Sequence, residues 1–227
     1  MYTNAVARIG YCEKVKEADL MVKNAYAPIR VARIEKGNTT IMYPVVYGLS
    51  NTTAQNHMNS LIRSVVSELV EAQHAEQDPA PYFQEMLGTF EVKNNQRGIL
   101  SIVFTNYAYA PKHAHGLNLA KSLTFSIDNG KLYNLNNLFR SDINYESYLS
   151  LLIEKQASIR NIPLLNDKIN VRKNQDFYLA DQTLVIYFQA YEIAPGYAGL
   201  PTFPLPAYSL EPILNQDGPL ATLSSGI

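Results

Sequence analysis

Apolar and polar residues alternate in several stretches of this chain, and the clearest stretch begins at Leu184. Leu184, Ile186 and Phe188 are apolar at every second position, and a loop with Pro195 and Gly196 follows them. Such alternation predicts a strand with one buried face. The same pattern and the turn residues between the runs predict four hairpins: 29–34 with 40–47, 83–93 with 99–109, 119–127 with 131–135, and 177–179 with 184–189.

Residues 52–77 instead carry apolar side chains at the spacing of an amphipathic helix. Thr52 and Gln55 have the spacing of a capping box at its start. Asn59 is expected on the solvent-facing side. The predicted buried face consists of Met58, Leu61, Ile62, Val65, Leu69 and Val70.

A second amphipathic helix is predicted over 142–160, because Tyr145, Leu149 and Ile153 share one face and Pro163 follows the segment. Weaker patterns predict a short helix at 13–23 and a short strand at 208–213. Pro44 predicts an edge position or a bulge in its strand.

The two halves of the chain share this order of elements. Leu100, Ile102, Phe104, Tyr107 and Pro111 match Leu184, Ile186, Phe188, Tyr191 and Pro195 at one constant offset. An amphipathic helix needs a partner for its apolar face, so each helix is expected to cover a sheet. The sequence therefore predicts an α+β fold with a mostly antiparallel sheet and two pseudo-repeated hairpin–helix–hairpin halves. The expected segments are an N-terminal extension (1–28), two modules (29–117 and 118–213) and a loose tail (214–227).

Composition removes several classes of function. The net charge is −1 and no Lys/Arg cluster is present, which argues against nucleic acid or an anionic membrane as partner. The single cysteine, Cys12, excludes an intramolecular disulfide. No apolar run reaches the length of a membrane span, and residues 1–10 lack the features of a signal peptide. The expected location is either the cytoplasm or, if an export segment precedes Met1, outside it.

The loops that leave the two equivalent strands, 111–117 and 195–206, are the predicted binding surface. Tyrosine is abundant (16 residues) and tryptophan is absent; tyrosine suits contact with proteins or sugars. Prolines in the second loop reduce the entropy lost on docking. A pseudo-twofold arrangement of the halves can bring the loops together. The alternative is that the large apolar residues fold back as a lid on the core. The candidate surface residues are Tyr191, Glu192, Pro195, Tyr197, Leu200, Phe203, His113 and His115.

His113 and His115 also offer a metal site, because alternate side chains of an extended loop point the same way. Glu192 or Asp176 is the candidate third ligand. The competing interpretation is two polar loop residues. The sequence contains no nucleophile elbow and no glycine-rich phosphate loop, so we expect neither catalysis nor a cofactor.

Several motifs resemble a known family. They include 175–179, 184–189 and 191–195 in the last hairpin, with 98–103 and 114–116 upstream. Across 29–213 the chain resembles the extracytoplasmic domain of the RsiV-type anti-sigma factors of Gram-positive bacteria. The same domain accompanies some peptidoglycan deacetylases. The resemblance implies a non-enzymatic cell-envelope domain with lysozyme as a possible protein partner. The alternatives are a peptidoglycan-binding module and a metal-dependent hydrolase that uses His113 and His115.

Overall fold

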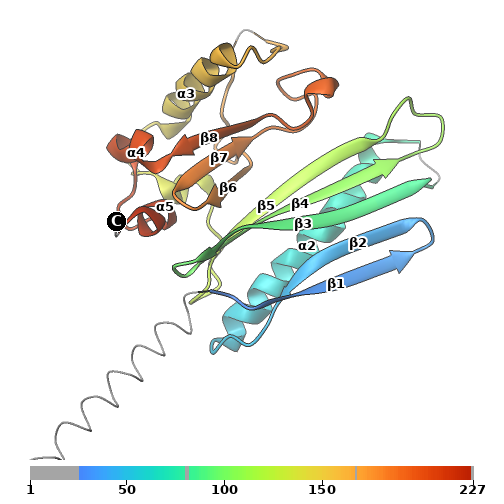
Figure 1. Cartoon of the computed structure of the whole chain (residues 1–227), viewed down its shortest axis with the longest axis horizontal. Coiled ribbons are helices and arrows are strands. Elements are labelled where there is room, and N and C mark those ends of the chain that lie inside the picture. Colours follow the sequence, from blue (N-terminus) through green and yellow to red (C-terminus); the bar gives the residue numbers. More distant parts are fainter. Residues whose placement is uncertain (1–25, 80–81, 167, 226–227) are drawn as a thin grey trace, which may run out of the picture.

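The computed structural model describes residues 26–79, 82–166 and 168–225 (Figure 1). The expected helix at 13–23 and Cys12 lie outside these residues. The described part is an α+β fold with a five-stranded and a three-stranded sheet. Its strands are β1 (Ile29–Lys36), β2 (Thr39–Val46), β3 (Glu85–Gln96), β4 (Ile99–Tyr109), β5 (Leu117–Ser126), β6 (Phe177–Ala180), β7 (Thr183–Tyr187) and β8 (Thr202–Pro206). Its helices are α2 (Thr52–Glu76), α3 (Tyr145–Ile159), α4 (Ala207–Leu210) and α5 (Pro219–Ser224).

The first sheet has the order β1-β2-β3-β4-β5 and is antiparallel apart from one pair. Strands β2 and β3 pair in parallel over Thr39–Ile41 and Met86–Gly88. Pro44 pairs with Val31 and lies beyond this short contact with β3, so β2 has an edge there as predicted. The predicted turn at 94–98 is tighter than expected. The hairpin closes through Arg97 and Gly98, which both have positive φ.

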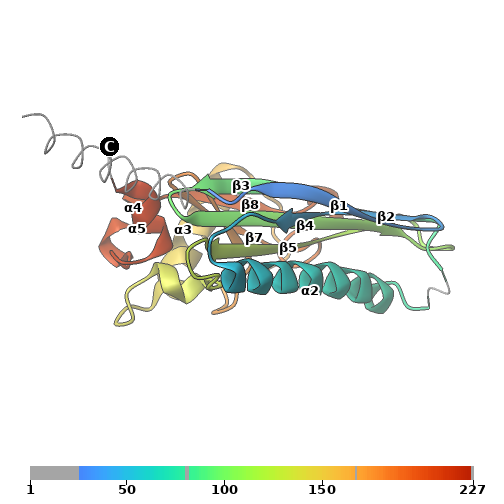
Figure 2. The same ribbon diagram turned by 90° about the horizontal axis from the view of Figure 1, so that it is seen from below.

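Helix α2 covers one face of this sheet (Figure 2). Met58 and Ile62 are fully buried, and they belong to the same core as Leu100, Ile102 and Phe104 of β4. The predicted capping box is wrong by one residue, because Asn51 caps the helix: its Oδ1 accepts from the Ala54 N–H at 3.0 Å. An asparagine at this position can reach the free amide of the first turn.

Asn59 was expected on the solvent side of α2, and it is buried instead. Its Nδ2 donates to the Val46 carbonyl at 2.8 Å, and its Oδ1 accepts from the Val46 N–H at 2.9 Å. The side chain therefore satisfies both main-chain groups of the last residue of β2. A polar residue on a helix is buried at low cost when it supplies such a pair of bonds.

Strand β5 belongs to the first sheet, although it follows the predicted module boundary at 117. It pairs with β4 from Leu117 to Ser126. The turn at 128–130 forms with Gly130 at positive φ, but the expected strand at 131–135 is reduced to a bridge between Phe125 and Leu132. Strand pairing thus assigns residues 118–126 to the first sheet.

The second sheet has the order β6-β7-β8 and contains a strand that the sequence analysis placed in a loop. Phe203 and Leu205 of β8 point into the core, and Pro204 is exposed between them. Prolines are tolerated here because β8 is an edge strand. Helix α3 satisfies its outer carbonyls, since Gln156 donates to Pro204 O and Arg160 donates to Thr202 O, each at 2.7 Å.

The C-terminal predictions are wrong. Residues 208–213 form α4 and a 3-10 turn rather than a strand, and α5 lies within the segment expected to be a loose tail. Leu220 and Leu223 of α5 are buried in the second core. Their spacing of three residues places both on one face of a short helix, which docks because that face is apolar.

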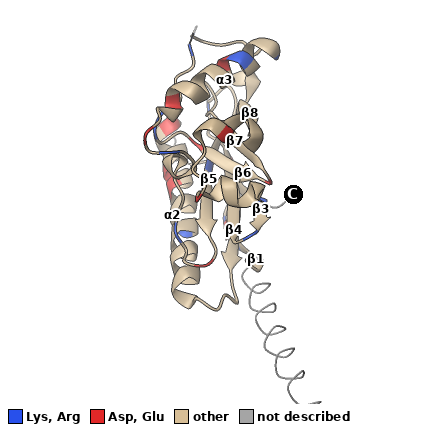
Figure 3. Cartoon of the chain, turned by 90° about the vertical axis from the view of Figure 1, so that its left-hand side faces the viewer, with Lys and Arg blue, Asp and Glu red and all other residues tan. Residues whose placement is uncertain are grey.

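Charged residues are dispersed along the chain in Figure 3. No helix of the described residues is both long enough and apolar enough to cross a membrane.

The inward positions predicted for the repeat are confirmed, because Phe104 and Phe188 are each 1% exposed in their respective cores.

Truncating Phe188 to Ala is expected to lower the free energy of unfolding by about 3–5 kcal/mol. Phe188 packs edge-on against Phe203, with ring centroids 5.8 Å apart, so the truncation leaves a cavity. Urea unfolding measures the loss. The control is Leu151→Ala on the exposed side of α3, expected to change stability by less than about 0.5 kcal/mol; equal effects would show that the burial of Phe188 is wrong.

Replacing Asn51 by Ala is expected to cost about 1 kcal/mol of stability, because the Ala54 amide loses its cap. The matched variant is Thr52→Ala. It should be nearly neutral, because the cap comes from Asn51. Thermal unfolding of the two variants compares them; a larger loss for Thr52→Ala would restore the capping box predicted from the sequence.

Candidate binding site

The loop after β4 and the loop after β7 meet at the surface. The Tyr191 hydroxyl and His115 Nε2 lie 3.0 Å apart, and the two rings stack with centroids 6.3 Å apart. His115 Nδ1 is 3.0 Å from the Gly116 carbonyl, which can only accept, so Nδ1 carries the proton. In the neutral imidazole, Nε2 then accepts from the Tyr191 hydroxyl. The meeting of the two loops that the repeat allowed is therefore present.

Two glycines of these loops pack closely against tyrosine rings. A Cβ on Gly196 would lie 2.2 Å from the Tyr191 ring, and a Cβ on Gly116 would lie 2.3 Å from the Tyr107 ring. Any other residue would push the rings away. Tyr191 itself has a φ of 66°, in the left-handed region. The loops are thus shaped by close packing of tyrosine on glycine.

Glu192 fixes the loop that follows β7. Its side chain is 19% exposed; Oε2 accepts from the Gln189 N–H at 2.8 Å, and Oε1 pairs with Arg172 at 2.6 Å. The Gln189 carboxamide in turn bridges the N–H and carbonyl of Ala120 at 3.1 and 2.8 Å. Through this chain of bonds the loop is fixed to the outer edge of β5.

Asp176 lies behind Gln189, which donates from Nε2 to Asp176 Oδ2 at 3.1 Å. Burial raises the pKa of the Asp176 carboxyl, and the charge of Lys121 opposes that rise. Burial also raises the pKa of Tyr187 well above its usual value. The Tyr187 hydroxyl donates to Ser122 Oγ at 3.0 Å. These groups form a polar layer between the two sheets.

The predicted surface residues divide into three groups. Tyr197 and Tyr191 are exposed, at 83% and 50%, and His115 is exposed beside them. The partly exposed residues are His113, Glu192, Pro195 and Leu200. Phe203 was wrongly placed on this surface: it is fully buried against Phe188 because it occupies an inward position of β8.

The alternative metal site at His113 and His115 has no third ligand among the described residues. Glu192 is paired with Arg172, and His115 is paired with Tyr191. Among the described residues, no group of three or more His, Cys, Asp or Glu side chains is arranged to hold a metal ion.

A cleft of about 360 Å³, lined by both polar and apolar residues, opens beside the same layer, between β5 and the segment that leads into β6. Sequence reasoning missed it, because its walls come from three separate stretches with no shared period. The lining residues are Ser122, Leu123, Thr124, Leu132, Tyr133, Asn134, Leu135, Asn136, Lys173, Asn174, Gln175, Asp176 and Phe177.

Comparisons with known families match two parts of the chain. Residues 35–118 match the family described as deacetylase PdaC, and residues 136–208 match a family described as a protein of unknown function, DUF3298. The predicted likeness to the domain found with peptidoglycan deacetylases is thereby confirmed. The RsiV-type assignment stays a prediction.

Individual proteins are also similar to this chain. A peptidoglycan-N-acetylmuramic acid deacetylase, PdaC, of Bacillus subtilis is 21% identical over 203 residues, which are 84% of this chain and 43% of that protein. The chain thus spans less than half the length of this relative. A DUF3298 member from Bacteroides fragilis has a TM-score of 0.66 at 14% identity, covering 89% of this chain and 99% of its own. A Pseudomonas aeruginosa member has a TM-score of 0.58 at 14% identity, covering 85% and 96%. Both structures show the fold.

Asp176→Asn is expected to flatten part of the dependence of stability on pH. Because the folded-state pKa of Asp176 lies above its ordinary 3.8, the folded protein binds this proton more tightly than the unfolded chain does. Stability from this group is therefore present below pH 3.8 and lost as the pH rises through the raised pKa. Urea unfolding across that window should show wild type losing stability relative to the variant; parallel curves would contradict the raised pKa.

Proposed function

We propose that this chain is a non-catalytic binding domain of the cell envelope, with its partner surface on loops 110–116 and 190–200. The observation that supports this most is the contact between Tyr191 and His115, which joins the two loops. Tyr197 stands beside this contact and is 83% exposed. A large aromatic side chain on a loop that is already fixed loses little entropy when it docks.

A protein partner of the lysozyme type is the leading candidate. It rests on the resemblance to the RsiV-type ectodomain in the motifs 175–179 and 191–195. The exposed tyrosines fit a protein interface, where tyrosine packs its ring and keeps its hydroxyl bonded. An extracytoplasmic location is part of the same proposal, supported by the likeness to a peptidoglycan deacetylase.

A second candidate is recognition of the wall glycan itself. The Bacillus subtilis relative is named for action on peptidoglycan, and this chain matches only 43% of its length. A region of that size can serve as a binding module beside a separate catalytic one. The metal-dependent hydrolase reading has no comparable support, because Glu192 is committed to Arg172.

The Tyr197→Ala variant is expected to weaken lysozyme binding about thirtyfold while leaving the melting temperature unchanged. Its ring is almost fully exposed, so its removal costs the fold little. The matched control is Tyr208→Ala, because Tyr208 is 80% exposed on α4, outside both loops. Biolayer interferometry gives the affinities. Equal weakening by the two variants would show that the loops are not the contact surface.

Sedimentation with purified peptidoglycan separates the two candidates. Retention by the glycan without lysozyme binding would favour the second candidate. Absence of both would overturn the proposed partners.

A further inference from the structure

The outer edge of β5 carries main-chain groups that β4 does not use. The N–H and carbonyl of Ala120 face outward, because both bond to Gln189. The Thr124 carbonyl also faces outward and accepts from the Tyr133 N–H at 2.8 Å. Successive residues of a strand alternate in direction, so Ser122, midway between them, points its N–H and carbonyl the same way.

Ser122 lines the cleft, and the outward side of its main chain is the side on which the cleft-lining Tyr133 bonds Thr124. Along the edge, Gln189 bonds Ala120 and Tyr133 bonds the Thr124 carbonyl. The Ser122 side chain is also committed, since it bonds Tyr187 and the Phe177 carbonyl. Among the described residues, the N–H and carbonyl of Ser122 therefore have no partner, and the Thr124 N–H on the same side has none either. An added peptide strand needs several such residues in a row, so this edge does not suit one.

Two carboxamide side chains of this protein already bind the N–H and carbonyl of a single residue. Gln189 on Ala120 and Asn59 on Val46 each place an acceptor and an adjacent donor against the N–H and carbonyl of one residue. A ligand for Ser122 needs the same two groups side by side. Neighbouring substituents of a sugar ring supply them: two hydroxyls, or a hydroxyl beside an acetamido N–H.

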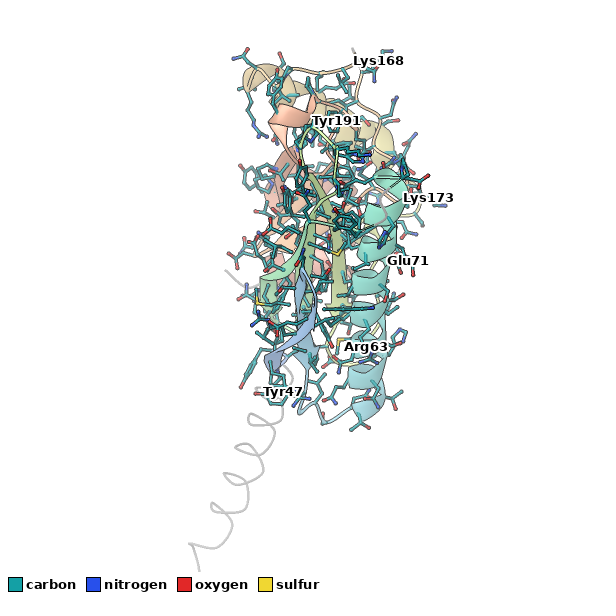
Figure 4. The ribbon with its side chains drawn as sticks, turned by 90° about the vertical axis from the view of Figure 1, so that its right-hand side faces the viewer. Tyr47, Arg63, Glu71, Lys168, Lys173 and Tyr191 are labelled. Carbon is teal, nitrogen blue, oxygen red and sulfur yellow. The ribbon has the colours of Figure 1, made fainter. Side chains whose placement is uncertain are left out.

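The rest of the cleft suits a ring that carries hydroxyls. Asn136, Lys173 and Asn174 are exposed at its walls, and their side chains make no hydrogen bond within the described part of the chain. Amide and ammonium groups are donors for hydroxyl oxygens, and the amides also accept. A volume of about 360 Å³ lies at the small end of ligand sites. Lys173 and Tyr191 are both labelled in Figure 4, at separate places on the molecule.

We propose that this cleft is a saccharide site that holds one sugar residue of a glycan, with the ring's vicinal donor and acceptor on the Ser122 main chain. Asn136 and Asn174 bind further hydroxyls. The site is distinct from the loop surface of the proposed function. It gives the domain a second, independent contact with a glycan of the cell envelope and does not require a protein partner.

The test is titration of the ¹⁵N-labelled full chain with the β-1,4 trimer of N-acetylglucosamine, followed by amide chemical shifts. Shifts are expected at Ser122, Thr124 and residues 173–176. The double variant Asn136→Ala/Asn174→Ala should bind about tenfold more weakly, the loss expected for two hydrogen bonds of modest net strength. Asn118→Ala is the matched control, because Asn118 is exposed on β5 and does not line the cleft.

Two further arms separate this site from the loops. Tyr197→Ala should bind the trimer as wild type does, and the double variant should keep wild-type binding to lysozyme. Acetamide tests for a site that accepts any carboxamide. Four outcomes would each overturn the saccharide site. The shifts could be confined to residues 110–116 and 190–200, or the double variant could bind the trimer as wild type does. Acetamide could cause equal shifts, or the trimer could cause none up to its solubility limit.

Discussion

One buried hydrogen bond joins the two sheets, and both candidate sites depend on it. The Leu179 N–H of β6 donates to Ser101 Oγ of β4 at 3.0 Å, and Ser101 is also bonded to Thr124 of β5 at 2.8 Å. Leu179 and Ser101 are fully buried. An unpaired amide at this depth costs about 1–3 kcal/mol, so β6 has one favoured place on the first sheet. That placement sets β7 and its exit loop opposite the exit loop of β4.

The same contact explains why the polar layer persists between two apolar cores. The side chains of Ser122 and Gln189 bond main-chain groups of Phe177 and Ala120, and the Tyr187 hydroxyl donates to the Ser122 side chain. A polar layer is stable when each member is bonded, and it permits only one relative position of the sheets. The loops that carry His115 and Tyr191 are thereby held in contact, while Asp176 remains half-buried beside the cleft. Because the boundary between the two sheets is rigid, the loop surface is already formed before a partner binds.

The sequence predicted elements whose pattern is local, and it missed those that depend on how distant segments pack together. Three of the four predicted hairpins and the apolar faces of α2 and α3 follow from periodicity, and they are confirmed. The second strand of the fourth hairpin, 131–135, is only a bridge. Strand β8 was missed because its prolines normally interrupt strands; at an edge covered by Gln156 and Arg160 they do not. Phe203 was consequently given a surface role. Helix α5 was missed because a helix of six residues is stable only when docked.

The candidate sites divide in the same way. The loop surface could be found from the repeat, because equivalent strands leave equivalent loops. The cleft could not, because it depends on which main-chain groups of β5 are already occupied. Asn59 on Val46, Asn95 on Ala27 and Gln189 on Ala120 each bridge the N–H and carbonyl of one residue. This chain thus repeatedly uses a side-chain carboxamide to satisfy a residue at the end or edge of its first sheet. The N–H and carbonyl of Ser122 have no such carboxamide partner among the described residues, and Ser122 lines a cleft with room for a ligand; the two facts together support the proposed binding.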